Sequence, residues 1–361
     1  MVNTEDISFF DEPLKIFSQI IEDINNAKHF VFIEVYIWIS DDIGNRFRDI
    51  VTKKVKQGIK IWLLLDSWGT RLPNSYFNEF IKHGGKVTFF KKINLINLNQ
   101  FTETHRRNHR KLIIIDDKIS YIGSFNINSY SLNWKESAIR INNSTISSTL
   151  RKVFWENLRI SSKYLFHNKK ITFSKPLVVN NNYEIIRDVP SSLIQNIKKR
   201  LIAIIENAKN YIIIETPYFI PGTQMIKALI DAAKRNVSVS IILPKHSDVT
   251  LIDLLRNKYL GNLYNAGIKI YFFQPQNLHA KLLIADDDKF YIGSSNFDYR
   301  SFRFQFEIGL FGNNPNLVET IKKHSFSLID ESEIFNYNNW KKRPLFQKLL
   351  EKIITPFRHL F

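Results

Sequence analysis

The stretch NHRKLIIIDDKISYIGSFN, residues 108–126, has a near copy in LHAKLLIADDDKFYIGSSN, residues 278–296. In both copies a His-x-Lys pair precedes an Asp, and a Gly-Ser pair and an Asn follow, the Asn 17 residues after the His. Two matches at identical internal spacing indicate a duplicated unit, because one short motif alone would be weak evidence. The polar residues retained in both copies are His109, Lys111, Asp116, Ser124 and Asn126 in the first and His279, Lys281, Asp286, Ser294 and Asn296 in the second.

The repeat extends beyond these motifs. The stretch NNAKHFVFIEVYIWI (25–39) matches ENAKNYIIIETPYFI (206–220) and aligns Glu34 with Glu215. The offset between the copies is 181 residues here and 170 at the His motifs, so the first half carries an insertion. We place it in the irregular stretch 91–108.

Each half alternates predicted helices and strands before its motif. The expected helices cover 13–27, 43–57, 74–83, 192–208, 223–235 and 249–266, and the expected strands cover 29–38, 59–66, 86–90, 210–216, 237–243 and 268–273. The motif itself reads as two strands joined by a turn at Asp117-Lys118. Such alternation is typical of an α/β sandwich with helices flanking a mixed sheet. We therefore predict a first repeat at 1–170, a second at 171–340 with the seam near 168–190, and a C-terminal segment at 341–361.

The composition limits the class of protein. A chain of 361 residues with 44% hydrophobic residues can bury a sizeable core, and the absence of cysteine excludes disulfides and thiolate metal sites. No apolar stretch is long enough to span a bilayer, because FVFIEVYIWI (30–39) is short and contains Glu34, so we expect a protein that is not integral to a membrane. The formal charge of +17 favours a polyanionic partner, either nucleic acid or an anionic lipid surface.

Paired histidines at such positions predict a phosphoryl-transfer site. An imidazole titrates near neutral pH, so one His can act as a nucleophile while the other, protonated, acts as a general acid. Lysines and asparagines around them supply positive charge and amide donors that stabilise a phosphoryl transition state. Neither half supplies both histidines. We therefore expect the halves to face each other across a pseudo-twofold axis and to build one shared site, without metal or cofactor.

Carboxylates follow both motifs. Each imidazole needs a partner for its second nitrogen, and Glu136 and Glu307, which follow their motif histidines by 27 and 28 residues, are the candidates. The motif aspartates, Asp116 and Asp286, complete the candidate catalytic set. Their odd separation from the His on a pleated strand nevertheless indicates that they hold the turn rather than act chemically.

These residues resemble the phospholipase D superfamily on both halves and over nearly the whole chain. The detail resembles the bacterial cardiolipin synthases, in NHRKLIIID (108–116), TPYFIPG (216–222) and GSSNFDYRS (293–301) with Glu307 after it. The resemblance implies a phosphatidyltransferase in which one His forms a phosphohistidine, the other protonates the leaving alcohol, and a second alcohol or water then attacks. It assigns the nucleophile to the first-half His109, although the residues alone do not distinguish His109 from His279.

The resemblance also sets expectations for partner and location. The substrate would be a phosphatidylglycerol-type lipid, and the enzyme would be a monomer working peripherally on the cytoplasmic side of the bacterial membrane. Many cardiolipin synthases begin with transmembrane segments, whereas this chain resembles their shorter relatives without them. The motif copies also differ after their Asn, with Asn128-Ser129-Tyr130 in the first and Asp298-Tyr299-Arg300 in the second. Non-equivalent half-sites fit distinct donor and acceptor sides.

The C-terminal segment KKRPLFQKLLEKIITPFRHLF (341–361) has apolar residues at helical spacing among lysines and arginines. This pattern is typical of an interfacial helix on an anionic membrane. A terminal helix can equally pack its apolar face on the domain core, and Pro356 would interrupt a continuous helix, so both interpretations stand.

Two other functions compete with the phosphatidyltransferase. A phospholipase or nuclease would hydrolyse diesters at the same site, and the charge of +17 suits DNA as well as lipid. A repeat scaffold that binds polyanions without catalysis is the third hypothesis. The completeness of both motifs argues against the scaffold.

Overall fold

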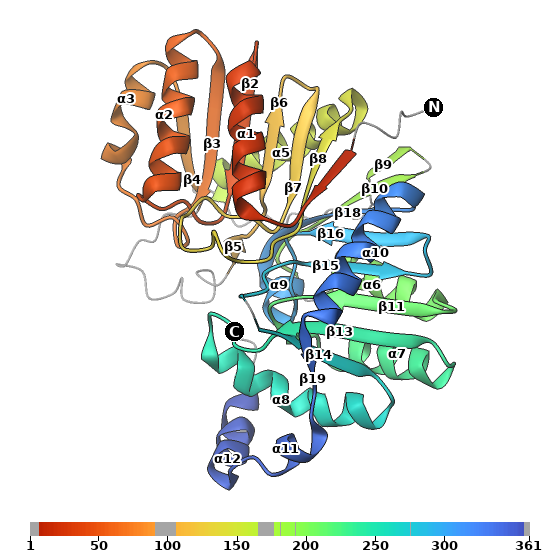
Figure 1. Cartoon of the computed structure of the whole chain (residues 1–361). Helices are drawn as coiled ribbons and strands as arrows, with labels where there is room; N and C mark the ends of the chain where they lie inside the picture. The colour runs from red at the N-terminus through yellow and green to blue at the C-terminus, as the bar shows by residue number, and fades with distance from the viewer. Residues whose placement is uncertain are drawn as a thin grey trace.

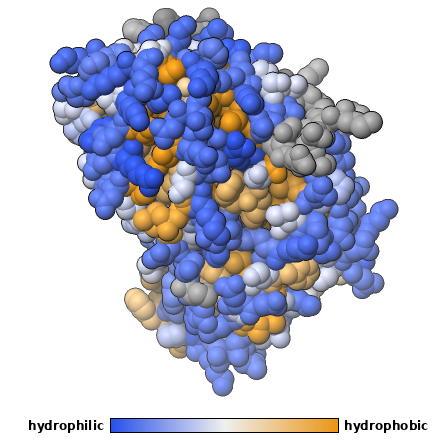
Figure 2. Space-filling model, turned by 45° about the horizontal axis from the view of Figure 1, so that its top comes forward, coloured by the Kyte–Doolittle hydropathy of each residue, from blue (hydrophilic) through white to orange (hydrophobic). Residues whose placement is uncertain are grey.

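The computed structural model describes residues 7–90, 106–164, 177–180, 182–191, 193–274 and 276–356. Within these ranges the chain forms two large β-sheets, one in each half of the sequence, with helices around them (Figure 1). Figure 2 shows hydrophilic side chains over most of the visible face, with hydrophobic side chains in several patches in the upper part, near the middle and lower down.

The first sheet has the strand order β1-β8-β7-β6-β2-β3-β4. Its strands are β1 (Ile7–Phe10), β2 (Phe30–Val35), β3 (Lys60–Asp66), β4 (Lys86–Phe90), β6 (Leu112–Ile115), β7 (Ile119–Gly123) and β8 (Ala138–Asn142). The connecting helices are α1 (Pro13–Asn26), α2 (Asp42–Lys56), the short η2 (Asn74–Phe77) and α3 (Asn78–Lys82), and α5 (Ser144–Tyr164). Strands β2, β3 and β4 are parallel because a helix connects each to the next, whereas the hairpin strand β6 is antiparallel to β2.

The second sheet repeats this plan. It has the order β19-β14-β13-β11-β15-β16-β18-β10-β9, so that β15-β11-β13-β14 corresponds to β6-β2-β3-β4. Its strands are β9 (Leu177–Asn180), β10 (Tyr183–Asp188), β11 (Tyr211–Glu215), β13 (Ser238–Pro244), β14 (Lys269–Phe273), β15 (Leu282–Ala285), β16 (Lys289–Gly293), β18 (Gln305–Gly312) and β19 (Ser332–Ile334). The helices are α6 (Asn196–Asn207), α7 (Thr223–Lys234), α8 (Thr250–Asn265), α9 (Tyr299–Phe304), α10 (Pro315–Asp330), α11 (Tyr337–Lys341) and α12 (Leu345–Ile354).

The two sheets share a core. Successive side chains of a strand point to opposite faces, so Leu112 and Ile114 of β6 face a cluster that also contains Ile284 and Ile292 of the second sheet. Ile113, on the other face of β6, packs with the helices of the first half. One face of α5 and one face of α10 complete the shared core. The expected architecture, two α/β repeats related by a pseudo-twofold axis, is confirmed.

Two short strand pairs lie next to the motif residues, one between the halves and one within the second half. β5 (Arg107–Asn108) belongs to the first half but pairs in parallel with β18 of the second. β12 (Phe219–Ile220) and β17 (Phe297–Asp298) form a separate two-stranded sheet within the second half. Both lie directly beside motif residues, and they therefore bear on the site.

Most predicted elements begin and end within a few residues of the observed ones. The predicted helix at 192–208 begins later, at Asn196. Within the predicted seam near 168–190, residues 183–188 form the mostly buried strand β10, which pairs with β18 of the second half. The expected insertion at 91–108 falls mainly outside the described residues. In the ranges that the structure describes, no helix is both long and apolar enough to cross a membrane.

Candidate active site

Each motif histidine lies just before the first strand of a buried hairpin. His109 precedes β6, and His279 precedes β15, whose residues are all buried. The hairpin turns place two consecutive aspartates in each half in the left-handed region, with φ of 54° at Asp116 and 54° at Asp286. Asp tolerates this conformation better than most residues, so the duplicated Asp-Asp sequence fits the duplicated turn.

The orienting carboxylates are exchanged between the halves. The Nδ1 atom of His109 lies 3.0 Å from Oε1 of Glu307, and Nδ1 of His279 lies 2.9 Å from Oε1 of Glu136. The sequence predicts the two glutamates as orienting candidates beside their own motifs. The structure pairs each with the histidine of the other half. With Nδ1 engaged, the Nε2 atom of each imidazole is left for substrate.

Backbone pairing across the seam produces this exchange. The residue before each glutamate accepts a hydrogen bond from the backbone N–H of the opposite histidine: His109 N donates to Phe306 O at 3.0 Å, and His279 N donates to Lys135 O at 2.7 Å. The glutamate that follows is thereby held against the imidazole. Each half-site is incomplete without the other half.

Serine hydroxyls hold the two carboxylates. Ser124 Oγ donates to Glu136, and Ser294 Oγ donates to Glu307. All four residues are essentially inaccessible to solvent. The Gly-Ser pair of the motif therefore fixes the carboxylate that serves the opposite histidine.

The motif lysines lie beneath the histidines. Lys111 Nζ donates to the carbonyl of His109 at 2.7 Å, and Lys281 Nζ donates to the carbonyl of His279 at 2.7 Å. Both lysines are fully buried. Burial lowers the pKa of Lys281 to about 8 and lowers the pKa of Lys111 well below its ordinary value, with nearby glutamates opposing the effect.

The motif aspartates do not join this cluster. The carboxylate of Asp116 accepts hydrogen bonds from the backbone N–H groups of residues 28, 29 and 30 at 2.6–2.8 Å. Asp286 does the same for residues 209, 210 and 211 at 2.6–3.0 Å. The carboxylates thus anchor the start of β2 and β11 to the hairpin turn, the structural role that the strand alternation indicates, and their inclusion in a catalytic set is not supported by position.

Both histidines open into one pocket of about 220 Å³ at the seam. The motif asparagines Asn126 and Asn296 also line it. Asn126 Oδ1 accepts from the N–H of Ile37 at 3.2 Å, whereas Asn296 Oδ1 is buried without a hydrogen-bond partner. The remaining lining residues are Tyr36, Ile37, Tyr130, Trp134, Tyr218, Asp248, Val249, Ile252, Asp298, Arg300 and Gln305.

The two walls of this pocket differ chemically. The ring of Trp134, from the first half, lies beside that of His279 with their centroids 5.5 Å apart. The positions equivalent to Tyr130 and Trp134 in the second half carry Arg300 and Gln305. Arg300 lies close enough to His109 to lower its pKa, so the second half adds a cation to the pocket at a position where the first half has an aromatic ring.

The two His–Glu pairs also differ in charge. Burial lowers the pKa of His109 well below its ordinary value, and the charges of Lys111 and Lys281 lower it further. Burial raises the pKa of Glu307 to about 7. Burial also lowers the pKa of His279, against the opposing effect of Glu136. Burial raises the pKa of Glu136 too, but His279 and Lys281 outweigh it and leave the net pKa below its ordinary value.

The sequence predictions did not include the pocket residues Tyr36, Tyr218 and Asp248. Tyr36 directly follows β2, and Tyr218 lies three residues beyond the end of β11, so a tyrosine just after each copy of the repeated strand was the available signal. Tyr218 donates its hydroxyl to Asp248 at 2.7 Å.

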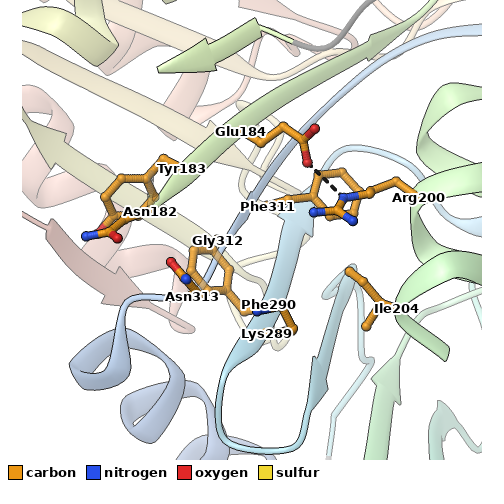
Figure 3. A pocket seen from close by; sticks show the side chains of 10 residues that line it. All are labelled: Asn182, Tyr183, Glu184, Arg200, Ile204, Lys289, Phe290, Phe311, Gly312 and Asn313. Atoms are coloured by element: carbon orange, nitrogen blue, oxygen red, sulfur yellow. Dashed lines mark hydrogen bonds and ion pairs between the residues drawn. The ribbon is translucent and has the colours of Figure 1, made fainter. Parts of the chain in front are cut away.

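A larger hollow, of about 470 Å³, lies in the second half (Figure 3). It is lined by residues around the ends of β10, β16 and β18 and includes the Glu184–Arg200 ion pair, with 2.8 Å between Oε2 and Nε. Neither motif histidine lines it. The active site is therefore assigned to the smaller pocket, because that pocket contains the paired histidines.

The fold and this site define an enzyme of the phospholipase D superfamily, a phosphatidyltransferase or phosphodiesterase built from two half-sites. The family described as "Cardiolipin synthase, PLD-like domain" matches residues 20–158 and 201–328. The matched segments cover more than half of the chain, and the chain belongs to this family.

Individual relatives agree with the family. The chain is 31% identical over 363 residues to a cardiolipin synthase of Clostridium perfringens (strain SM101 / Type A), covering 97% of this chain and 75% of that protein. It is 29% identical over 353 residues to the major cardiolipin synthase ClsA of Bacillus subtilis (strain 168), covering 93% and 71%. The crystal structure of phosphatidylserine synthase from Haemophilus influenzae Rd KW20 shares the fold, with a TM-score of 0.77 at 16% identity over 99% of this chain and 96% of that one.

Proposed function

We propose that the chain transfers a phosphatidyl group from phosphatidylglycerol, or a similar phospholipid, to a lipid alcohol. The transfer proceeds through a phosphohistidine and releases glycerol. The observation that carries the proposal is the pair of histidines in one pocket, each held at Nδ1 by a glutamate from the opposite half. The enzyme works peripherally, on the cytoplasmic side of a bacterial membrane, as a monomer with one site.

The charge difference between the His–Glu pairs favours His109 as the nucleophile. A nucleophilic imidazole must be neutral, and burial together with Lys111 and Lys281 favours neutral His109. A general acid must carry a proton. Burial lowers the pKa of His279 as well, but the charge of Glu136 opposes that effect, so His279 keeps its proton more readily than His109 does. His279 is therefore assigned as the acid.

In the first step, Nε2 of His109 attacks the phosphorus of the donor lipid. A bond forms between phosphorus and nitrogen, and the bond from phosphorus to the oxygen of the headgroup glycerol breaks. His279 gives its Nε2 proton to that oxygen, so glycerol leaves as a neutral alcohol. In their protonated forms, the buried lysines Lys111 and Lys281 stabilise the charge that develops at the phosphoryl group.

In the second step, the hydroxyl of a second lipid gives its proton to the neutral His279 and attacks the same phosphorus. The bond between phosphorus and His109 breaks, and both histidines return to their starting states. One phosphodiester is made for each one broken, so the exchange needs no external energy source. Water in place of the lipid alcohol would give hydrolysis.

The pocket wall favours a lipid over a nucleic acid. Trp134, Val249 and Ile252 line the site beside the histidines, and Val249 remains 37% exposed. Apolar and aromatic groups at the mouth suit acyl chains leaving a phosphodiester headgroup, whereas a duplex would need cations that follow its backbone.

The test is incubation of purified protein with phosphatidylglycerol in detergent micelles, and in parallel with plasmid DNA. Cardiolipin and free glycerol in equal amounts are expected. Phosphatidic acid without cardiolipin would indicate a phospholipase, and nicked DNA would indicate a nuclease. His109→Ala and His279→Ala should each lower turnover on the order of 10⁴-fold, since nucleophile and acid act as a unit. Full activity in either variant would overturn the mechanism.

A further inference from the structure

The helix α12 sits on the protein with its apolar side facing outward. Leu345, Phe346, Leu349 and Ile353 are 81%, 75%, 56% and 56% exposed. At helical spacing these four residues form one continuous face, which we call the α12 stripe. Single exposed apolar side chains are common on protein surfaces, but aliphatic and aromatic side chains grouped in this way mark an interaction surface.

The orientation of α12 is fixed by polar contacts on its opposite side. Glu351, the charged residue of that side, is buried and accepts two hydrogen bonds from the guanidinium of Arg343 at 2.9 and 2.7 Å. Asn257 of α8 also donates to Glu351, at 3.2 Å. Because a charged group faces the protein, the helix cannot turn its apolar side inward without breaking these bonds.

The connection before α12 strengthens this attachment. The guanidinium of Arg343 lies 4.1 Å above the ring of Trp340, and Trp340 Nε1 donates to the carbonyl of Asn257 at 3.2 Å. The indole also lies against Gly261 of α8, where any side chain would collide with it. The α12 stripe is therefore held on a rigid base.

Cationic side chains lie close to the stripe in the sequence. Lys341 and Lys342 precede α12, and Lys348 and Lys352 lie on the helix itself. Apolar residues flanked by lysines complement a surface that is apolar inside and anionic outside, which describes a bilayer containing acidic phospholipids.

The end of α12 lies near the active-site pocket. At the end of α12, Ile354 packs on a small cluster formed by Ile220, Ile252 and Leu255. Ile252 also lines the pocket of the two histidines, as does the half-exposed Val249 at the start of α8. The end of α12 thus packs on the same part of α8 whose first residues line the pocket (Figure 1 shows α12 beside α8).

We propose that the α12 stripe inserts into the interface of an anionic bilayer and seats the pocket mouth at the level of the lipid headgroups. The inference rests on the proposed lipid substrate and names the surface that delivers it. A lipid bound in the bilayer could then present its phosphodiester to His109 without leaving the membrane entirely. The helix contacts the domain through Glu351 and Ile354, and its docking on a membrane stays a prediction.

The test compares two double variants of the full chain. L349E/I353E places charge on the stripe, and L14E/I81E is the matched control, since Leu14 and Ile81 are 55% and 43% exposed on helices of the first half. Co-sedimentation with vesicles containing phosphatidylglycerol should fall at least about ten-fold for the stripe variant and stay unchanged for the control. Vesicles of phosphatidylcholine alone should bind the wild type weakly.

Activity separates this inference from the proposed function. The stripe variant should turn over phosphatidylglycerol in detergent micelles at the wild-type rate and lose turnover only on vesicles. His279→Ala protein should bind vesicles normally. If vesicle binding follows the prediction while no variant or wild type makes cardiolipin, the proposed function fails and the docking surface stands.

A fluorescent label gives a second, direct readout. The chain has no cysteine, so Ile353→Cys and the control Leu14→Cys can each carry one environment-sensitive dye. A blue shift on anionic vesicles is expected at position 353 and not at position 14. Unchanged vesicle binding by L349E/I353E, equal shifts at both positions, or a wild-type dimer that the stripe variant dissociates would overturn the proposal.

Discussion

The two half-sites share a framework and differ at the rim. Lys111 and Lys281 each donate a hydrogen bond to the carbonyl of their own histidine. Asp116 and Asp286 each accept hydrogen bonds from three equivalent backbone N–H groups in their own half. At the mouth, by contrast, the first half presents mainly aromatic side chains, and the second presents charged and amide side chains together with Tyr218. The hydrogen bonds that position each histidine are therefore the same in both halves. The side chains that affect the protonation of each histidine differ between the halves.

This difference matches the chemistry. One imidazole must attack phosphorus while the other gives up a proton, and two identical environments would give both the same pKa. The exchanged glutamates make the asymmetry possible, because Glu307, with its pKa raised to about 7, serves His109, while the more acidic Glu136 serves His279.

The largest effect should come from breaking the exchange itself. Glu307→Gln and Glu136→Gln should each lower turnover about 100-fold or more, because the histidine loses its orienting acceptor. The two variants should differ with an activated donor. A 4-nitrophenyl leaving group needs no proton, so it should restore the first step, measured as a burst of 4-nitrophenol, in Glu136→Gln, which impairs the acid His279, and not in Glu307→Gln. Rescue of both, or of Glu307→Gln alone, would reverse the assignment.

The framework should respond symmetrically. Asp116→Ala and Asp286→Ala each remove an acceptor of three backbone hydrogen bonds, and each should lower the free energy of unfolding by about 1–3 kcal/mol in denaturant titrations. Turnover per folded molecule should stay within about three-fold of wild type, because neither carboxylate reaches the pocket. A loss of turnover comparable to that of the glutamate variants would instead place these aspartates in the chemistry.

The rim should respond asymmetrically. Arg300→Ala should raise KM for phosphatidylglycerol about ten-fold, because the guanidinium is the cation of the pocket wall beside His109. Its counterpart Tyr130 is half-exposed, and Tyr130→Phe should change KM by less than about three-fold. Steady-state kinetics in micelles measures both. Equal effects at the two positions would show that the walls are not specialised.

The smallest effects should appear in the pH profile. Below about pH 7 Glu307 is protonated and donates to Nδ1 of His109, which leaves the proton on Nε2 and blocks attack, so turnover should rise with pH through about 7. Above about pH 8 Lys281 loses its proton and its charge, so turnover should fall. Lys281→Arg should move the alkaline limb upward, since Arg stays protonated. An alkaline limb unmoved by that change would exclude Lys281 as its source.

Much of this could be predicted from the sequence because it is local. The hairpins, the Asp-Asp turns and the helix–strand alternation each arise within about 20 residues, and the repeat doubles the signal. The structural role of Asp116 also followed from the alternation of a strand.

The exchange of glutamates was not predictable in the same way. Glu307 lies 198 residues from His109 and meets it only because Phe306 pairs with Asn108 across the seam. Nothing near Glu136 or Glu307 in sequence distinguishes pairing within a half from pairing between halves. The apolar and lysine pattern of α12 was likewise visible, but only its attachment through Glu351 shows which side faces outward.

The most direct measurement is the position of the covalent intermediate. His279→Ala should react with a phosphate-labelled phosphatidyl donor bearing a 4-nitrophenyl leaving group and should accumulate a phosphohistidine, because the base for the second step is missing. Quenching in alkali preserves the bond between phosphorus and nitrogen for peptide mapping. The account predicts label on the peptide that contains His109, and none in His109→Ala. Label on His279 in the His109→Ala protein, or turnover without any covalent label, would contradict it.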